Sequence, residues 1–218
     1  MTVQALNLAH PFFGVTFITD ETTYKLSGRA IVLNLGEKPI AVEGQDLPPL
    51  QSSILIDTRL VNIGKAVVVR GFDDFENEYS FLARIRREWL SAYEVRREER
   101  LRGIEHYMSP KQWIGQIGLT FYHSASVPLN VGLHKDHPFC PVPGFREVHT
   151  QIVGLGKMQQ CRERDISTLY LEEVMAPGMT HRPMFDEQGA YPWHQFETIT
   201  PGVFMAVEML PKGAHPPA

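Results

Sequence analysis

The sequence predicts a mainly β protein of the sandwich or barrel class, with one long helix. Short runs of β-branched and apolar residues, separated by turn residues, fill the first 70 positions, and seven closely spaced runs of the same kind follow residue 115. Between the two groups lies a single stretch with helical periodicity. Because no helix is expected among the later strands, a sandwich or barrel is favoured over a fold of alternating strands and helices.

The first 71 residues are expected to form an antiparallel sheet. Turn-rich pieces such as SGR and EGQDLPP separate the strand candidates, which are 13–19, 30–35, 39–42, 53–56 and 66–70. No linker rich in Pro or Gly divides this segment from the rest of the chain. We therefore expect residues 1–71 to pack on the later barrel or to extend it.

Residues 72–107 are expected to be helical. Apolar side chains recur three or four positions apart, as on the buried face of an amphipathic helix, and they are Phe75, Tyr79, Leu82, Ile85, Trp89 and Tyr93. The pattern predicts one long helix that ends near Gly103. Its charged run RREERLR, at 96–102, could offer an anion-binding face, but mixed-sign runs are more often a solvated helix surface, and we favour that interpretation.

Residues 108–218 are expected to form the main barrel. Their strand candidates alternate with short turn-rich pieces and lack any segment long enough for a crossover helix. The candidates are IGLTFYHS at 117–124, VPLNVGLH at 127–134, REVHTQIVG at 146–154, KMQQCR at 157–162, STLYLEEVMA at 167–176, PWHQFETI at 192–199 and VFMAVEML at 203–210.

The composition narrows the classes of function. A formal net charge of −4 gives no electrostatic attraction to nucleic acid or to an anionic membrane. No apolar run approaches the roughly 20 residues of a membrane-spanning helix, and the N-terminus does not have the pattern of a secretion signal. The two cysteines, Cys140 and Cys161, do not make a disulfide framework. These features predict a cytoplasmic protein whose partner is a small molecule.

Four histidines and a glutamate are concentrated in the strand-like stretch 132–181, and seven of the nine histidines lie within 106–194. Imidazole is the commonest metal-binding side chain, and a carboxylate beside several imidazoles suits a divalent transition metal. Glu147, His149 and Gln151 alternate along one strand and should share a face. A glutamate and a histidine on an inward face are costly to bury unless they are paired or bind a metal.

Three pieces of this stretch carry a resemblance to a known family. They are GLHKDH at 132–137, EVHTQIVG at 147–154 and PGMTH at 177–181. They resemble the two motifs of the cupin superfamily: closely spaced histidines followed by a glutamate and a glycine, and later a histidine three positions after a glycine. The resemblance extends over 115–210. It implies a cupin-type jelly-roll barrel with a metal ion in its mouth, preceded by a β-rich extension and the helix.

The motif positions imply a set of metal ligands, which are His134 (or Asp136), His137, Glu147 and His181. Such a set suits one divalent transition metal, with iron favoured and zinc, manganese and nickel as alternatives. His149 and His194 would then face inward beside the metal, where they could move protons near neutral pH.

The candidates for orienting a polar substrate are Tyr122, Gln151, Arg182, Trp193 and Gln195. His106 and His123 are assigned structural roles, because a single histidine in a barrel is more often a hydrogen-bonded structural residue than a ligand. Both cysteines are also taken as structural, since neither has a visible activating partner.

The function expected from this site is that of a metal-dependent enzyme acting on a small polar metabolite. The resemblance favours an iron-dependent oxygenase, because cupin dioxygenases use three histidines with a glutamate. A Lewis-acid isomerase, cyclase or lyase with zinc, manganese or nickel is the first alternative. A non-catalytic barrel that binds a small ligand is the second. Jelly-roll proteins often pair through their sheets, so a homodimer is expected.

Overall fold

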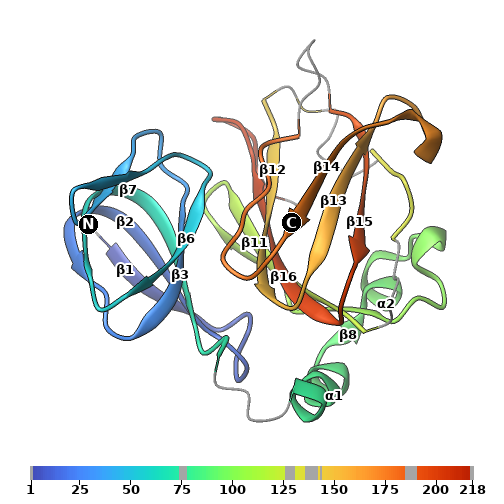
Figure 1. The fold of residues 1–218 in the computed structure, drawn as a ribbon, viewed down its shortest axis with the longest axis horizontal. Coiled ribbons are helices and arrows are strands. Elements are labelled where there is room, and N and C mark those ends of the chain that lie inside the picture. Colours follow the sequence, from blue (N-terminus) through green and yellow to red (C-terminus); the bar gives the residue numbers. More distant parts are fainter. Residues whose placement is uncertain are drawn as a thin grey trace.

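The computed structural model describes residues 2–73, 78–125, 131–135, 142, 144–184 and 191–216. Within these ranges the chain forms three antiparallel sheets of seven, six and three strands. Figure 1 shows two β-rich halves side by side, with the short helices at the lower edge of the second half. None of the helices in the described ranges has the length and apolar character needed to cross a membrane.

The N-terminal half is the seven-stranded sheet, coloured blue to teal in Figure 1. Its order is β1-β2-β7-β3-β6, and β4 pairs with both β5 and β7. The strands are β1 (Thr2–Leu6), β2 (Gly14–Lys25), β3 (Arg29–Asn34), β4 (Ile40–Val42), β5 (Gln45–Leu47), β6 (Ser52–Ile56) and β7 (Arg59–Arg70). All five strand candidates of this segment are confirmed, and β1 and β5 are additional.

The helical segment is shorter and more broken than the single long helix that the periodicity predicts. It consists of α1 (Glu78–Glu88), β8 (Leu90–Ser91), α2 (Ala92–Arg96) and the 3-10 turn η1 (Glu99–Leu101). The helix stops because Leu90 and Ser91 pair with a later strand. Ser91 then starts α2 through a capping box with Glu94, and Arg97 ends it in the left-handed conformation at φ 58°. The apolar face is nevertheless buried at Ile85 and Trp89.

The C-terminal half consists of two sheets that face each other. The six-stranded sheet has the order β12-β16-β11-β9-β8, with β10 on β11, and the three-stranded sheet has the order β14-β13-β15. The strands are β9 (His106–Met108), β10 (Gln112–Ile114), β11 (Ile117–Ser124), β12 (Arg146–Val153), β13 (Gly156–Cys161), β14 (Leu169–Met175), β15 (Trp193–Thr198) and β16 (Gly202–Met209), with a 3-10 turn η2 (Ile166–Thr168) before β14.

Six of the seven strand candidates in this half are confirmed. The exception is 127–134: residues 126–130 lie outside the described residues, and 131–134 make only an isolated bridge, between His134 and His194. Residues 131–134 therefore contact β15 at this bridge.

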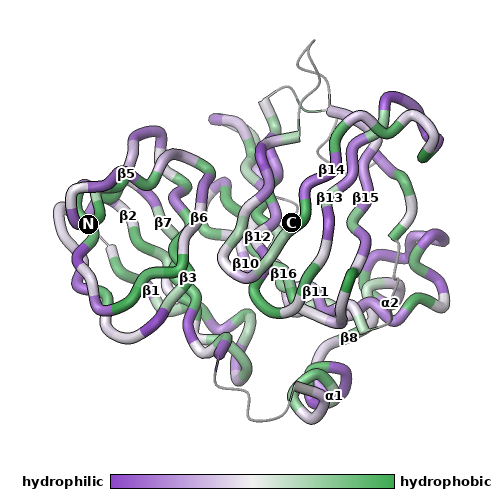
Figure 2. The backbone as a smooth tube through the Cα atoms, in the orientation of Figure 1, coloured by the Kyte–Doolittle hydropathy of each residue, from purple (hydrophilic) through white to green (hydrophobic). Residues whose placement is uncertain are grey.

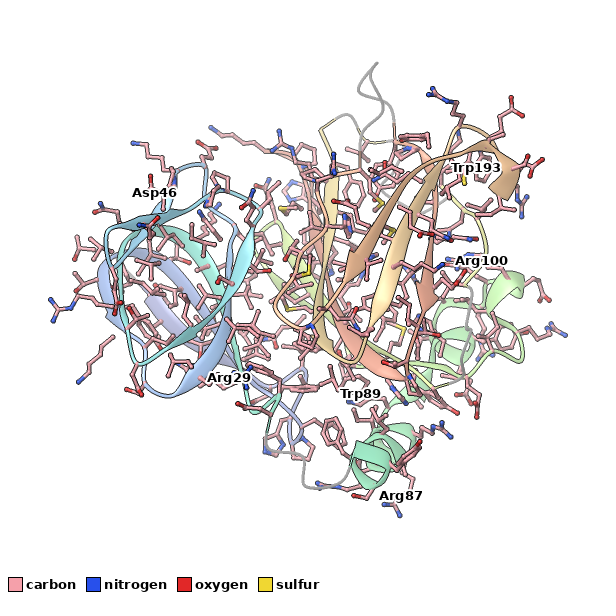
Figure 3. All side chains as sticks on the ribbon, viewed as in Figure 1. Arg29, Asp46, Arg87, Trp89, Arg100 and Trp193 are labelled. Atoms are coloured by element: carbon pink, nitrogen blue, oxygen red, sulfur yellow. The ribbon has the colours of Figure 1, made fainter. Side chains whose placement is uncertain are left out.

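The β12–β16–β11 layer has two different faces. Its outward face is apolar and shares one hydrophobic core with the N-terminal sheet and α1, through residues that include Phe121, Val148 and Val207. The rings of Phe13 and Phe121 stack across this boundary with centroids 5.5 Å apart, and Figure 3 shows Trp89 at the same junction. The inward face carries the polar side chains that line the interior of the second half.

Candidate functional site

A small cavity lies between the two sheets of the C-terminal half. Its volume is about 30 Å³, which is roughly the volume of one water molecule. Four imidazoles, one carboxylate, one phenol and two guanidinium groups line it. The lining residues are Arg96, Arg100, Leu101, His106, Tyr122, Val131, His134, Glu147, His149, His194, Phe196 and Phe204.

Strand β12 brings Glu147 and His149 into the cavity. Glu147 lies opposite Glu208 and His149 opposite Ala206 on β16, so the prediction that alternate residues of this strand share an inward face is confirmed. The Glu147 carboxylate receives hydrogen bonds from His149 Nε2 at 3.2 Å and from the Tyr191 hydroxyl at 2.8 Å. His149 Nδ1 is buried and has no hydrogen-bond partner within the described residues. The pair is therefore a carboxylate and imidazole already in position to share a proton.

His134 and His194 meet on the opposite wall. Their backbones form a bridge with two N–H···O bonds of 3.0 Å, and their ring centroids are 4.3 Å apart. In each ring Nδ1 donates to a carbonyl two residues earlier, Gly132 O at 2.7 Å and Pro192 O at 3.1 Å. A carbonyl only accepts, so Nδ1 carries the proton and Nε2 keeps its lone pair. Metal-bound histidines commonly have this arrangement.

His181 does not have the position predicted for a metal ligand. Its Nε2 accepts the backbone N–H of His149 at 2.9 Å, and its Nδ1 donates to Arg182 O at 2.7 Å, so both ring nitrogens are engaged. Burial, and then the neighbouring His149, lower its pKa to about 3. The neutral ring therefore attaches the turn around Gly178 to β12.

His106 lines the cavity, although the sequence assigned it a structural role. Its ring stacks on Tyr122 with centroids 5.0 Å apart, and Nδ1 lies 3.0 Å from Ser124 Oγ. Burial, followed by the charges of Arg96 and Arg100, lowers the pKa of His106 to about 3, so the ring stays neutral. His123 does have structural surroundings: it lies on the outward side of β11 and donates from Nδ1 to Gly202 O at 2.8 Å.

Arg96 and Arg100 are the site residues that the sequence analysis missed. Both belong to the charged run that was interpreted as a solvated helix face, yet their side chains are only 18% and 15% exposed. Glu98 forms ion pairs with both. The Arg96 guanidinium lies 5.9 Å from the Tyr122 ring centroid. Tyr122, and then Glu98, hold the pKa of Arg96 above its usual value, whereas burial raises the pKa of Tyr122 to about 12.

Of the five substrate-contact candidates, only Tyr122 lines the cavity. Gln151 points inward but donates to Val153 O at 2.8 Å on its own strand. Arg182 is exposed and pairs with Glu173 at 3.0 Å.

Trp193 and Gln195 lie on the outward face of β15, because His194 and Phe196 take the inward positions of that strand. Lys135 and Arg164 flank the Trp193 ring, which Figure 3 shows near the rim of the barrel. Gln195 donates to Gln159 at 2.7 Å on the same outward face. Neither side chain is among the residues that line the cavity.

The donor groups fit a divalent metal in kind but are not assembled around one point. Among the described residues no group of three or more His, Cys, Asp or Glu side chains is arranged to hold an ion. Asp136, His137 and Cys140 lie outside the described residues. The lone pairs of His134 and His194, the Glu147 carboxylate and the unpartnered Nδ1 of His149 are nevertheless the donors such an ion would use.

No protein-family model matches this chain, and no curated protein matches it in sequence. Solved structures do resemble it in fold. A cupin 2 conserved barrel domain protein from Leptotrichia buccalis is 12% identical, with a TM-score of 0.35, over 96% of this chain and 88% of that one. A mutant of oxalate decarboxylase from Bacillus subtilis is 10% identical, with a TM-score of 0.38, over 94% and 70%.

A mutant of salicylate 1,2-dioxygenase from Pseudoaminobacter salicylatoxidans is 9% identical, with a TM-score of 0.37, over 94% of this chain and 75% of that one. Likenesses at this level carry no residue role across, so the chemistry of the site rests on this chain's own geometry. Two facing antiparallel sheets, with Glu147, His134 and His149 between them, give this protein the mainly β, barrel-like fold that the sequence predicts.

Proposed function

We propose that this protein is an enzyme that binds one divalent metal ion in its C-terminal barrel and acts on a small anionic metabolite by proton transfer. The observation that carries the proposal is the convergence of four histidines, Glu147 and two arginines on one small cavity. Such groups are expensive to bury together unless they serve a ligand.

The residues that would hold the metal are His134 and His194, with His137 as a further candidate from the motif, and Glu147 and His149 remain available for proton transfer. A bound divalent metal would polarise a substrate carbonyl as a Lewis acid, and iron would in addition allow chemistry with dioxygen. We expect the metal to be iron. With iron, the specific function that we propose is that of an iron-dependent oxygenase. Zinc, manganese or nickel would instead favour an isomerase, cyclase or lyase.

Other side chains of the cavity would transfer the proton and stabilise developing charge. The Glu147–His149 pair accepts and returns a proton, and the hydrogen bond from Tyr191 orients the carboxylate. Tyr122, with its pKa raised to about 12, stays protonated and can donate a hydrogen bond to a developing oxyanion.

Charge balance favours an anionic substrate. The cavity and its rim hold Arg96 and Arg100 against Glu98 and Glu147, so the guanidinium and carboxylate charges cancel. A divalent metal would then leave two positive charges in excess in a medium of low dielectric. A carboxylate on the substrate would offset part of that excess.

Metal analysis of protein purified without a histidine tag or added metal tests the proposal. We expect close to one equivalent of a transition metal, and a large loss of metal in the His134→Ala/His194→Ala double variant. His123→Asn, a change of another buried histidine on the outward side of β11, is the matched control and should keep its metal. A wild-type protein with no bound metal, after incubation with each candidate ion, would overturn the metal-dependent form.

One observation favours a second candidate, a metal-free proton-transfer enzyme. Both Glu147 oxygens already take part in hydrogen bonds, and no three donors are preassembled in the described part of the chain. In that case His149 and Glu147 alone would shift a proton on the substrate. The same metal analysis separates the two candidates.

A further inference from the structure

A second and much larger pocket lies beside α2, with a volume of about 630 Å³. Its lining residues are Glu88, Leu90, Val95, Arg96, Glu98, Met108, Ser109, Pro110, Lys111 and Glu208. The cavity of the proposed site has about the volume of one water molecule, whereas several hundred Å³ is typical of small-molecule sites. The pocket is therefore large enough for a ligand of its own.

The wall of the pocket is mainly apolar. Leu90 and Val95 are 62% and 48% exposed, and because both line this pocket they are not isolated apolar residues on the surface. Met108, at the end of β9, and Pro110 extend the same wall. These four side chains give the pocket an apolar surface that a ring or a short alkyl chain can cover.

Two of the three carboxylates in the pocket already have cationic partners. Lys111 Nζ lies 2.6 Å from Glu208 Oε2. Arg96 pairs with Glu98 at 3.5 Å, and Glu98 also pairs with Arg100, which lines the neighbouring cavity. Both cations of the pocket are therefore paired, and they give it no excess of positive charge.

Glu88 is the carboxylate that remains. It is exposed, and none of the ion pairs in the described part of the chain includes it. Arg84, one helical turn earlier, instead lies over the ring of Phe12, with its Cζ atom 5.7 Å from the ring centroid. Glu88 is also the last residue of α1, where the helix dipole adds partial negative charge. Three carboxylates against two cations therefore leave the pocket one negative charge in excess.

We infer that this pocket binds a small organic cation, an amine with an apolar body of about arylalkyl size. Its ammonium group lies beside the Glu88 carboxylate at the end of α1, and its apolar body covers Leu90, Val95 and Met108. Such a ligand suits the pocket in two ways, because its charge offsets that of Glu88 and its body removes apolar surface from water. The site is separate from the proposed metal-dependent function and goes beyond it.

Titration of the protein with four probes, followed by amide chemical shifts in NMR spectra, measures this binding and locates it. 3-Phenylpropylamine has the body and the positive charge, 3-phenylpropanol has no charge, 3-phenylpropionate has the opposite charge, and propylamine lacks the ring. At low ionic strength we expect the phenyl amine to bind about fivefold more tightly than the alcohol, which is the effect of a partly exposed ion pair, and the acid to bind more weakly than the alcohol. Propylamine should bind about tenfold or more weakly than the phenyl amine, because it buries no ring.

Two variants separate the contributions of the charge and of the apolar wall. Glu88→Gln should weaken 3-phenylpropylamine about fivefold and leave 3-phenylpropanol within about twofold. Glu99→Gln, at a glutamate whose side chain is 73% exposed and does not line the pocket, is the matched control and should leave both probes within about twofold. Val95→Trp adds bulk at an exposed position of the pocket wall, away from the core, and should weaken both probes.

The outcome is distinguishable from failure of the proposed function, because binding requires neither metal nor turnover. The His134→Ala/His194→Ala double variant should bind 3-phenylpropylamine as the wild-type protein does. No binding of 3-phenylpropylamine to the wild-type protein would overturn the inference, as would equal or tighter binding of the alcohol or the acid. Binding that both Glu88→Gln and Val95→Trp leave unchanged, or shift changes confined to residues outside the pocket, would also overturn it.

Discussion

The two β-rich halves of this protein have the same kind of framework and opposite interiors. The N-terminal interior is filled by aliphatic side chains such as Ala30, Val32, Leu60 and Val68. The C-terminal interior combines methionines and aromatic rings with buried histidines, glutamines and a glutamate. Figure 2 shows the same contrast along the chain, with green stretches in β3 and β7 and purple stretches in β13 and β14.

The difference separates stability from chemistry. A well-filled aliphatic interior gains free energy from burial and from close packing. An interior that holds imidazoles and guanidinium groups loses part of that gain, because these polar groups lose their hydration. A protein keeps such an interior where binding of a ligand offsets the loss. The two halves share one hydrophobic core, and through it the N-terminal half stabilises the β12–β16–β11 layer that carries the site.

The largest expected effect that tests this contrast is the loss of unfolding free energy in acid. Burial lowers the pKa values of His106 and His181 to about 3 and that of His123 to about 4, whereas an unfolded histidine titrates near 6.5. Between these values the unfolded chain binds more protons than the folded one, so stability falls as the pH falls below 6.5. From pH 7 to pH 5 we expect the free energy of unfolding to drop by about 5 to 6 kcal/mol, at about 1.4 kcal/mol per pKa unit for each of the three histidines.

Urea unfolding at several pH values above 5 measures this drop before the carboxylates begin to titrate. His123→Asn should remove about a third of it. His10→Asn, which changes the exposed and only histidine of the N-terminal half, is the control and should remove none. A free energy of unfolding that is level between pH 7 and pH 5 would show that these rings are not held neutral.

The second test removes aliphatic packing from the other interior. Leu60 is fully buried in the N-terminal half, so Leu60→Ala should lower the free energy of unfolding by about 3 kcal/mol through lost burial and the cavity it leaves. Leu169→Ala, at a side chain that is 38% exposed, is the control and should cost less than about 0.5 kcal/mol. Equal costs for the two variants would contradict the assigned roles.

The sequence predicted the sheets well because each strand carries its own signal. Period-2 alternation and β-branched residues depend on neighbours along the chain, and they located β3, β11, β12 and β16. The predicted long helix failed at Ser91 for a tertiary reason. Pairing of Leu90 and Ser91 with β9 interrupts the helix, and residues far apart in sequence determine that pairing.

The sequence predicted the kinds of side chain in the site, but only some of the residues that line it. Alternation along β12 placed Glu147 and His149 on the inward face correctly. On β15 the same alternation puts His194 and Phe196 on the inward face, and it would therefore have excluded Trp193. Nothing local distinguishes Arg96 from the exposed arginines beside it. Its burial follows from the end of α2 facing the cavity, which is a property of the packed molecule.

A third test concerns the contact between the two halves. Ser52 Oγ on β6 donates to Gly178 O at 2.7 Å and lies 2.6 Å from Thr180 Oγ1. Ser52→Ala should lower the free energy of unfolding by about 1 kcal/mol, because both partners lose a hydrogen bond at a partly buried interface. Ser53→Ala, one position along the same strand, is the control. A smaller effect at Ser52 than at Ser53 would show that these hydroxyls do not hold the halves together.

The smallest expected effect sharpens the contrast at the entrance to the site. Ser91 caps α2, accepting from Glu94 N at 3.2 Å, and α2 ends at Arg96. Ser91→Ala should cost about 1 kcal/mol or less in unfolding free energy measured by urea unfolding, because it removes the acceptor of the Glu94 N–H. Ser91→Asp retains a capping acceptor and should restore the value. If Ser91→Ala leaves the unfolding free energy unchanged, α2 is held in place by the contacts of Arg96 with Glu98 and Tyr122 rather than by its cap.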